Sequence, residues 1–239
     1  MDTLPYPTMI FLLAFSHDMI TAESLYNILY ARYGTTGWWP ADSPDEVIVG
    51  TILTQNTSWT NVEKAIQSLK ESGPVTLQRI CSMPTEELEV AVRSSGFYRQ
   101  KAARLKDLAC AILRKYGSVE AMAMERSDET ANFLKNIKGV GQETLDSILL
   151  YALSKPVFVV DKYTARIFQR TGIMEKPDLK SIKSAVHHFL DGDTEALKNF
   201  HGMIVYLGKD YCRTKPLCRD CPVNKVCDYA IKNPEQSAQ

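Results

Sequence analysis

The 239-residue sequence has no excess of charge of either sign, because 28 lysines and arginines balance 28 aspartates and glutamates. The overall charge therefore identifies no class of partner. Long hydrophobic runs are also absent. The segment PTMIFLLAF is too short to span a bilayer, and it has neither a basic leader nor a clear cleavage site of small residues. We therefore expect an intracellular protein with no membrane partner, in which residues 1–18 form an N-terminal extension.

Signals for β-strands are scarce. No stretch alternates polar and apolar side chains between hairpin turns. Only PVFVV, residues 156–160, is β-branched and extended, and its shortness favours a buried connector that leads to Asp161. Repeats and low-complexity tracts are absent apart from the polar end of the chain, where we expect residues 233–239 to be disordered.

Apolar side chains recur at helical spacing along most of the chain. A first helix begins near Thr21, and Ser43 has the position of an N-cap, with Pro44 next and Glu46 completing a capping box. We therefore expect an all-α protein of roughly ten helices. Further helices are expected at about 60–71, 76–82, 85–94, 99–116, 118–124, 128–135, 142–153, 161–171, 179–190 and 194–211.

The local charge is strongly positive between residues 93 and 115, where Asp107 alone opposes the basic side chains. Such a run is typical of a solvated helix face, and a strip that binds phosphate groups is the alternative. The basic residues are Arg93, Arg99, Lys101, Arg104, Lys106, Arg114 and Lys115.

Four of the six cysteines lie near the C-terminus with the spacing C-x5-C-x2-C-x5-C. Thiols this dense in an intracellular chain indicate a metal group rather than disulfides. A single C-x2-C pair, flanked symmetrically and followed by proline, favours a four-iron, four-sulfur (4Fe-4S) cluster, with zinc or no metal as alternatives. Cys81 and Cys110 are isolated within helical patterns. The expected ligands are Cys212, Cys218, Cys221 and Cys227.

Two basic residues, Arg213 and Lys215, lie between the first two of these cysteines and precede Pro216. A cluster and a proline would hold this loop rigid. The loop could then contact a phosphate backbone.

The stretch KGVGQET joins two helical patterns. Gly139 and Gly141 let the turn adopt positive φ and let backbone N–H groups face outward at the start of the second helix, where the helix dipole favours an anion. Asp161 follows about twenty residues later, after the apolar connector.

These motifs occur in the order found in the helix-hairpin-helix DNA glycosylase superfamily, which the chain resembles over about residues 20–230. The four cysteines are similar to those of the endonuclease III branch. The segments WWP, LTQNT, SGFYRQKA, KGVGQET, VVDKY and FHG most resemble the endonuclease III-like 3-methyladenine DNA glycosylases.

The resemblance implies two helical domains with a DNA-binding cleft between them. Residues 19–41 and 156–232 would form one domain with the cluster loop, and residues 42–155 would form a helical barrel with the hairpin. It also implies a cytoplasmic, nucleoid-associated, monomeric prokaryotic enzyme that acts on double-stranded DNA containing a damaged base.

Asp161 matches the catalytic aspartate of the family, which stabilises the oxocarbenium ion formed on the sugar and can orient the attacking water. It could equally be the N-cap of the next helix, and both roles are compatible. Endonuclease III has a nucleophilic lysine where this chain has Glu143. A carboxylate cannot form a Schiff base, so the resemblance implies base removal without strand nicking. Lys162 is the residue most able to restore a lyase step.

The other site residues follow from the same resemblance. Aromatic side chains in the WWP segment would stack on an electron-poor alkylated purine. Gln55 would fill the gap left by the extruded nucleotide, and Phe97 would act as a wedge on the opposite strand. The expected substrate pocket contains Trp38, Trp39, Pro40, Gln55, Glu143 and Lys162. The expected DNA contacts are Gln55, Phe97, Lys138, Gly139, Val140, Gly141, Thr144, Arg213 and Lys215.

Three other functions remain open at this stage. The protein could be a bifunctional glycosylase and lyase for oxidised pyrimidines, a mismatch glycosylase for thymine or adenine, or a noncatalytic DNA-binding module. The chain also departs from the resembled families in two places. The first cysteine interval is x5 where endonuclease III usually has x6, and Met203 stands in the FHG helix where the 3-methyladenine branch can have lysine.

Overall fold

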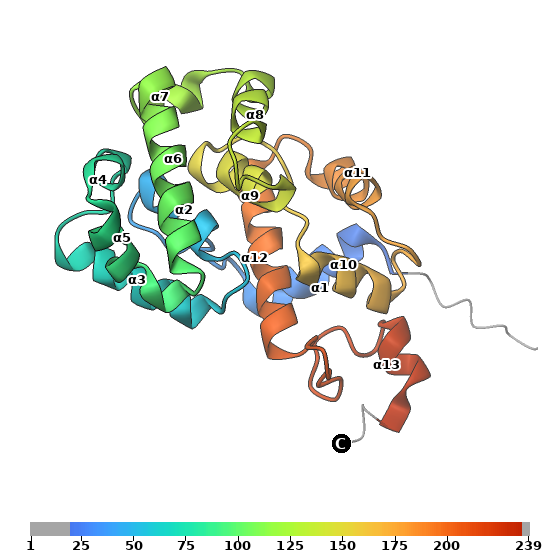
Figure 1. The fold of residues 1–239 in the computed structure, drawn as a ribbon. Coiled ribbons are helices and arrows are strands. Elements are labelled where there is room, and N and C mark those ends of the chain that lie inside the picture. The colour runs from blue at the N-terminus through green and yellow to red at the C-terminus, as the bar shows by residue number, and fades with distance from the viewer. Residues whose placement is uncertain (1–19, 236–239) are drawn as a thin grey trace, which may run out of the picture.

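The computed structural model describes residues 20–235, so the predicted N-terminal extension and residues 236–239 of the tail lie outside the described residues. Every regular element within this range is helical, which confirms the all-α prediction (Figure 1). The helices are α1 (Ala22–Tyr33), α2 (Pro44–Leu53), α3 (Trp59–Glu71), α4 (Leu77–Ser82), α5 (Thr85–Ala91), η1 (Arg93–Ser95, 3-10), α6 (Tyr98–Tyr116), α7 (Val119–Met124), α8 (Ser127–Lys135), α9 (Gln142–Ser147), η2 (Ile148–Ala152, π), α10 (Lys162–Thr171), α11 (Leu179–Leu190), α12 (Thr194–Asp210) and α13 (Asp228–Lys232).

The helices pack in two groups that meet at η2 (Figure 1). In the first group α12 packs against α1, α10 and α11, and α13 packs against α10. In the second group α6 packs against α2, α4, α5 and α7. The π-helix η2 contacts both α2 and α12, and all five of its side chains are buried. This grouping accords with two domains, whose exact boundaries stay a prediction.

Residues 156–160 form no strand and run directly into α10. Phe158 and Val159 are buried in the core, as expected for a connector of this kind. The connector therefore delivers Asp161 to the first turn of α10 from a fixed direction.

The capping box predicted at α2 is only half present. Ser43 accepts a hydrogen bond from the Glu46 backbone N–H at 3.2 Å, and Pro44 begins the helix. The Glu46 carboxylate instead lies 2.9 Å from Lys70 Nζ on α3. Glu46 is buried, so its charge is stabilised by a cation from another helix rather than by its own N-cap.

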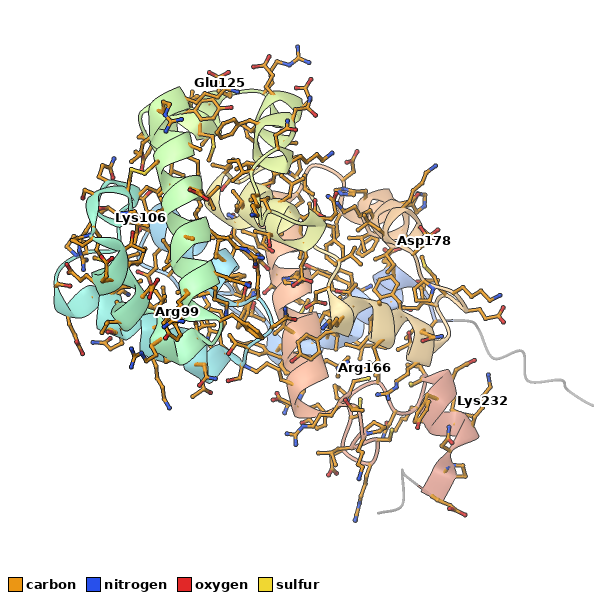
Figure 2. All side chains as sticks on the ribbon, viewed as in Figure 1. Arg99, Lys106, Glu125, Arg166, Asp178 and Lys232 are labelled. Carbon is orange, nitrogen blue, oxygen red and sulfur yellow. A yellow bond between two sulfur atoms is a disulfide. The ribbon has the colours of Figure 1, made fainter. Side chains whose placement is uncertain are left out.

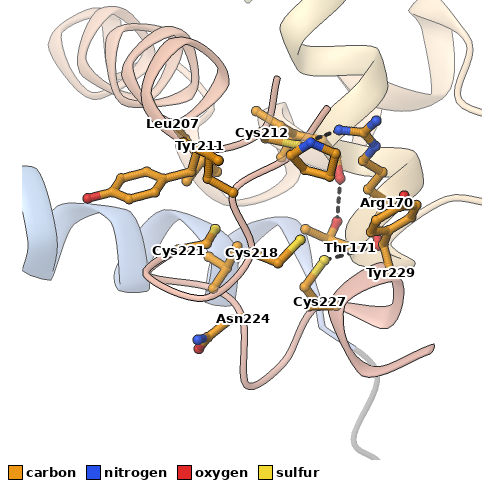
Figure 3. Close-up of a pocket in the computed structure, with 15 residues that line it drawn as sticks. Arg170, Thr171, Leu207, Tyr211, Cys212, Cys218, Cys221, Asn224, Cys227 and Tyr229 are labelled. Atoms are coloured by element: carbon orange, nitrogen blue, oxygen red, sulfur yellow. Dashed lines mark hydrogen bonds between the residues drawn. The ribbon is translucent and has the colours of Figure 1, made fainter. Parts of the chain in front are cut away.

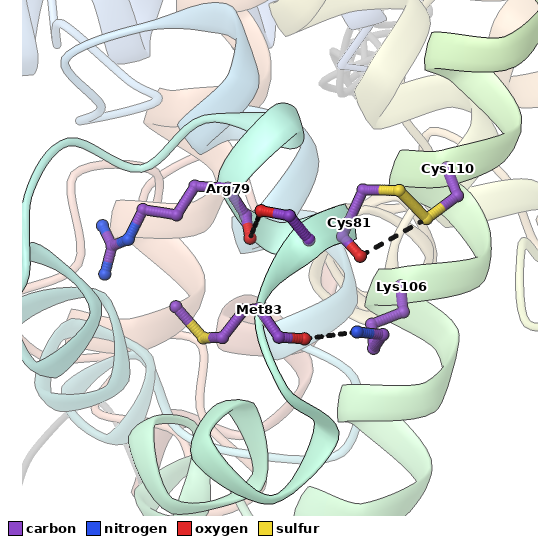
Figure 4. Close-up of a disulfide and its surroundings, with 6 residues drawn as sticks. Arg79, Cys81, Met83, Lys106 and Cys110 are labelled. Atoms are coloured by element: carbon purple, nitrogen blue, oxygen red, sulfur yellow. Dashed lines mark hydrogen bonds between the residues drawn. A yellow bond between two sulfur atoms is a disulfide. The ribbon is translucent and has the colours of Figure 1, made fainter.

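Cys81 and Cys110, expected to be isolated, are joined by a disulfide (Figure 4). The packing of α4 against α6 brings their Cα atoms to 5.1 Å from each other. Helical periodicity places each cysteine on a helix face but does not predict which faces meet.

The short helix α13 was also not predicted, because its five residues are too few to display a helical period. The side-chain amide of Asn233, directly after it, donates to the Tyr229 carbonyl at 2.8 Å. Residues 233–235 of the predicted disordered tail are thus among the described residues. In the described part of the chain, no helix has the length and apolar character needed to cross a membrane.

The basic run between residues 93 and 115 does not form one continuous strip. Arg99 is exposed near the start of α6, whereas Lys106 further along the helix donates to the Met83 carbonyl (Figure 2). The ammonium of Lys115 lies over the rings of Tyr116 and Phe133. Several of these cations therefore have partners within the protein.

Lys101 is the buried member of this run, with 2% of its surface exposed. Its ammonium donates to the carbonyls of Leu53 at 2.8 Å and Ser95 at 2.6 Å. These residues end α2 and η1, so Lys101 joins the segments that lead to Gln55 and Phe97. Burial, together with the nearby charge of Arg104, lowers the pKa of Lys101 to about 8.

The folded protein loses the Lys101 proton at lower pH than the unfolded chain does, because lysine in the unfolded chain has its ordinary pKa. The contribution of Lys101 to the free energy of unfolding therefore rises from about pH 7 to about pH 9, by about 1 kcal/mol. We expect urea unfolding of the native protein to show this rise relative to Lys101→Met. Parallel pH dependences in the two proteins would contradict it.

The contact between α10 and α12 depends on a glycine. A Cβ added at Gly208 would lie 2.2 Å from Tyr163 Cδ1 and 2.9 Å from Tyr163 Cβ. Atoms so close to the backbone of α10 cannot move aside without shifting the helix.

We therefore expect Gly208→Ala to lower the free energy of unfolding by about 1–2 kcal/mol, as other overpacking substitutions do. Gly141→Ala is the matched control, because nothing lies within 4 Å of a Cβ at that position. The control should stay within about 0.5 kcal/mol of the native protein in the same urea titration. Equal stabilities of the two variants would mean that α10 and α12 are not in close contact.

Candidate active site

Asp161 is the N-cap of α10, as one of its two expected roles requires. Its Oδ1 accepts hydrogen bonds from the Thr164 backbone N–H at 2.7 Å and from the Thr164 hydroxyl at 2.8 Å. The side chain is 12% exposed. Two hydrogen bonds on one oxygen fix the carboxyl rotamer and leave Oδ2 available for another partner.

The neighbour of Oδ2 is His201 on α12, whose Nε2 lies 3.7 Å away. His201 Nδ1 is 2.7 Å from the Tyr151 hydroxyl, which is also 3.2 Å from the Lys198 carbonyl. Both side chains are buried. Sequence reasoning assigned neither residue a role, although His201 lies in the FHG motif and was the available signal.

The pKa values of two neighbouring carboxyl groups are displaced in opposite directions. Burial raises the pKa of Asp161, but His201 and the hydrogen bonds from Thr164 outweigh burial and hold it below its usual value. Glu143 is exposed, yet surrounding protein atoms partly desolvate its carboxyl and raise its pKa, and the charge of Asp161 raises it further. Paired carboxyls with separated pKa values are typical of sites where one group stays ionised and the other handles protons.

Lys162 follows Asp161 in sequence but is exposed. Its positive charge lowers the pKa of Glu143, so the ammonium lies within electrostatic reach of that carboxyl. The predicted residues Asp161, Glu143 and Lys162 are thus brought together at the junction of the hairpin and α10.

Three tryptophans form an aromatic cluster beside η2. The ring of Trp59 lies 5.0 Å from that of Trp38 and 5.3 Å from that of Trp39, centre to centre. Trp39 is also 5.6 Å from the Tyr151 ring, which links the cluster to His201. Trp59 was not predicted as a site residue, because it lies on α3 and reaches the WWP segment only through folding.

A cavity of about 210 Å³ lies next to this cluster. Its walls include Trp39, Pro40 and Trp59, and two acidic side chains, Glu46 and Glu63, also line it. Trp39, which lines the cavity, contacts the Tyr151 ring, and the Tyr151 hydroxyl in turn lies 2.7 Å from His201 Nδ1. Of the predicted pocket residues, Trp39 and Pro40 line the cavity. The other four do not: Trp38, Gln55, Glu143 and Lys162.

Trp38 packs against α12 instead. A Cβ at Gly202 would lie 2.5 Å from the Trp38 Cβ, so only glycine permits this approach. Asn199 lies three residues before Gly202 on the same helix. Its side-chain oxygen accepts hydrogen bonds from the Thr36 backbone N–H at 2.7 Å and from the Thr36 hydroxyl at 3.0 Å. The loop before α2 is therefore held on α12, with Trp38 anchoring it and Trp39 facing the cavity.

The hairpin between α8 and α9 is tied to the end of α2 by Gln55. The Gln55 amide donates to the Gly139 carbonyl and to the Thr144 hydroxyl, both at 3.0 Å, and its oxygen accepts from Arg104 at 2.9 Å. Gly139 has φ of 92°, as predicted for the turn, whereas Gly141 has φ of −83° and needs no such freedom. Gln55, Gly139 and Thr144 are thus direct neighbours.

The remaining predicted DNA contacts lie at the surface near the hairpin or on the cysteine loop. Phe97 is 66% exposed and has the left-handed φ of 46°, which is uncommon for a bulky residue. Lys138 and Gly141 are exposed, and Val140 is half-buried. Arg213 and Lys215 are exposed on the cysteine loop.

The four clustered cysteines line one cavity with Leu207 and Tyr211 (Figure 3). Arg170 donates to Cys212 Sγ at 3.4 Å and to the Arg213 carbonyl at 2.6 Å, which fixes the loop on α10. Four thiols that face one apolar cavity suit an iron–sulfur cluster. Among residues 20–235, however, no group of three or more possible ligands has the arrangement of a metal site.

Comparison with known proteins agrees with this arrangement. A sequence profile described as HhH-GPD superfamily base excision DNA repair protein matches residues 49–190. The chain is 44% identical over 208 residues to a candidate DNA repair glycosylase of Methanocaldococcus jannaschii, covering 85% of this chain and 94% of that protein. It is 29% identical over 187 residues to endonuclease III of Thermotoga maritima, covering 78% of this chain and 83% of that protein.

A similar solved structure is that of H. pylori 3-methyladenine DNA glycosylase bound to 1,N6-ethenoadenine. It superposes with a TM-score of 0.71 at 29% identity, over 80% of this chain and 98% of that chain. The matched profile spans more than half of the 239 residues. The chain therefore belongs to the HhH-GPD superfamily of base excision DNA repair proteins and is a DNA glycosylase of that family.

Proposed function

We propose that this protein is a monofunctional glycosylase that hydrolyses the bond between deoxyribose and an alkylated purine, with 3-methyladenine as the preferred base. The observation that carries the proposal is a fixed, ionised Asp161 beside Glu143, at the place where a lyase would need an amine. Its substrate is double-stranded DNA containing the damaged base.

The chemistry requires an anion next to the sugar. As the bond from C1′ to the base nitrogen breaks, both electrons leave with the base and positive charge develops on the sugar. The Asp161 carboxylate stabilises this charge at no cost of reorganisation, because its N-cap hydrogen bonds already hold it in place. Water then attacks C1′ and gives up a proton.

Glu143 is the acceptor that suits this proton. Its carboxyl has a raised pKa and is exposed, so it can accept a proton in the cleft and release it to solvent. Neither carboxylate can form the imine through which a lyase nicks the strand. The products are an abasic site and a free base.

The aromatic cavity supports an electron-poor base as substrate. An alkylated purine that carries positive charge is attracted to indole faces and to anions, and the cavity offers Trp39, Trp59 and Glu63, whereas Glu46 is paired there with Lys70. Cationic bases also have weakened glycosidic bonds, so they need less help from the enzyme. The H. pylori protein that this chain resembles is named for 3-methyladenine.

DNA would be engaged by the residues around the hairpin. Extrusion of the nucleotide leaves a gap that Gln55 would fill, while the exposed Phe97 ring would insert on the opposite strand. The backbone and side chains that would contact phosphates and flanking nucleotides are those of Lys138, Gly139, Val140, Gly141, Thr144, Arg213 and Lys215.

Cys212, Cys218, Cys221 and Cys227 would hold a 4Fe-4S cluster. When bound, such a cluster supplies a rigid scaffold for the loop of Arg213 and Lys215. The residues of the chain alone carry the hydrolysis.

The direct test is Asp161→Asn. Asparagine is also a good N-cap, so the fold should survive, but a neutral amide cannot stabilise the sugar cation. We expect single-turnover release of 3-methyladenine to fall by about 100-fold or more. Asp178→Asn is the matched control, since Asp178 caps α11 in the same way and is exposed. Release at the native rate by Asp161→Asn would refute the proposal.

The substrate class is tested by Trp59→Leu. Loss of the indole should lower kcat/KM for 3-methyladenine by about tenfold, because a cation–π contact at a desolvated site contributes roughly 1–2 kcal/mol. The affinity for undamaged duplex should not change, since Trp59 lies by the cavity and not at the hairpin. An unchanged kcat/KM in this variant would mean that the base does not enter the aromatic cavity.

A further inference from the structure

We infer that His201, oriented by Tyr151, is a positioning residue that directs its Nε2–H at Oδ2 of Asp161 and keeps this carboxylate aligned with the sugar. The inference deepens the proposed function and rests on it. It is carried by the geometry of three buried or nearly buried side chains from η2, α10 and α12.

The two oxygens of Asp161 have unequal surroundings. Oδ1 accepts both hydrogen bonds from Thr164, whereas Oδ2 faces His201 Nε2 at 3.7 Å. Thr164 thus fixes the position of Oδ1. Because only this oxygen is hydrogen-bonded, the carboxylate plane can still rotate and move Oδ2. A second donor at Oδ2 would restrain the plane of the carboxylate.

His201 has a nitrogen available for this purpose. The side chain is buried, and Nε2 has no hydrogen-bond partner among the described residues. A buried ring nitrogen without a partner is costly, and Asp161 Oδ2 is an acceptor 3.7 Å from it. Hydrogen bonds of catalytic groups are often long before the substrate binds and shorten in the complex.

Tyr151 determines which nitrogen of His201 carries the hydrogen. The tyrosine hydroxyl lies 2.7 Å from Nδ1, and burial together with the charge of Asp161 raises its pKa, so the hydroxyl stays protonated. The hydroxyl has one hydrogen and two acceptors within reach, Nδ1 at 2.7 Å and the Lys198 carbonyl at 3.2 Å, and the shorter contact is to Nδ1. A hydroxyl that donates to Nδ1 makes this nitrogen an acceptor and places the ring hydrogen on Nε2. The His201 ring also packs near the rings of Tyr151 and Phe158, at 5.8 Å and 6.4 Å between ring centres.

Other charged groups lie near His201 and Asp161 and contribute to any dependence of the activity on pH. Glu143 on α9 and Lys162 on α10 lie within electrostatic reach of the site. On α12 the Lys198 ammonium is 2.8 Å from Glu195 and 3.2 Å from the Ser154 hydroxyl. His201 is the group that faces Oδ2, so its removal should change the protonation of Asp161 more than that of the other charged groups.

The experiment compares His201→Leu with His201→Gln, whose amide can still donate to Oδ2. We expect His201→Leu to lower kcat for 3-methyladenine release by about tenfold with KM nearly unchanged, and to move the acid limb of the kcat profile to higher pH. His201→Gln should restore most of kcat and return the acid limb toward its native position. Tyr151→Phe should behave as a milder form of His201→Leu.

A purely structural role for His201 predicts a different pattern. The losses of activity would then follow the melting temperatures of the variants, glutamine would not rescue activity, and the acid limb would not move. That result would overturn the inference. Failure of the proposed function is distinguishable, because it would appear as native activity in Asp161→Asn whatever the His201 variants do.

Discussion

The account depends on the hydrogen bonds between Asp161 and the first turn of α10. The backbone N–H and the hydroxyl of Thr164 both bind Oδ1, and they stabilise the ionised carboxyl at a site from which water is largely excluded. Burial alone would favour the neutral acid. His201 and the N-cap bonds from Thr164 together keep this buried aspartate charged, and in the proposed mechanism they prepare the anion that the reaction needs.

The surrounding packing brings the other groups to this anion. Glycines let two elements approach α12 closely: Gly202 admits Trp38 of the loop before α2, and Gly208 admits Tyr163 of α10. The π-helix η2 contacts both groups of helices and presents Tyr151 to His201. Gln55 and Lys101 likewise hold the segments that would enter the DNA. A small number of polar contacts therefore joins the segments to which we assign catalysis and DNA binding.

Much of the fold and part of the site could be predicted from local patterns. Helical spacing indicated most of the helices, and the apolar run before Asp161 indicated a buried connector. What could not be predicted depends on contacts between distant segments. Cys81 is bonded to Cys110 because α4 packs on α6. The Glu46 carboxylate pairs with Lys70 on α3 and does not complete the capping box of its own helix. Trp59, Tyr151 and His201 reach the site only through tertiary packing, and of the three only His201, in the FHG motif, is marked by its local sequence.

The most direct test of the central claim is borohydride reduction of the protein during its reaction with duplex DNA that contains 3-methyladenine. If two carboxylates alone sever the bond, the damaged base is released, the strand stays intact until alkali is added, and no protein becomes linked to the DNA. A stable adduct between Lys162, or any other amine, and the sugar would contradict the account.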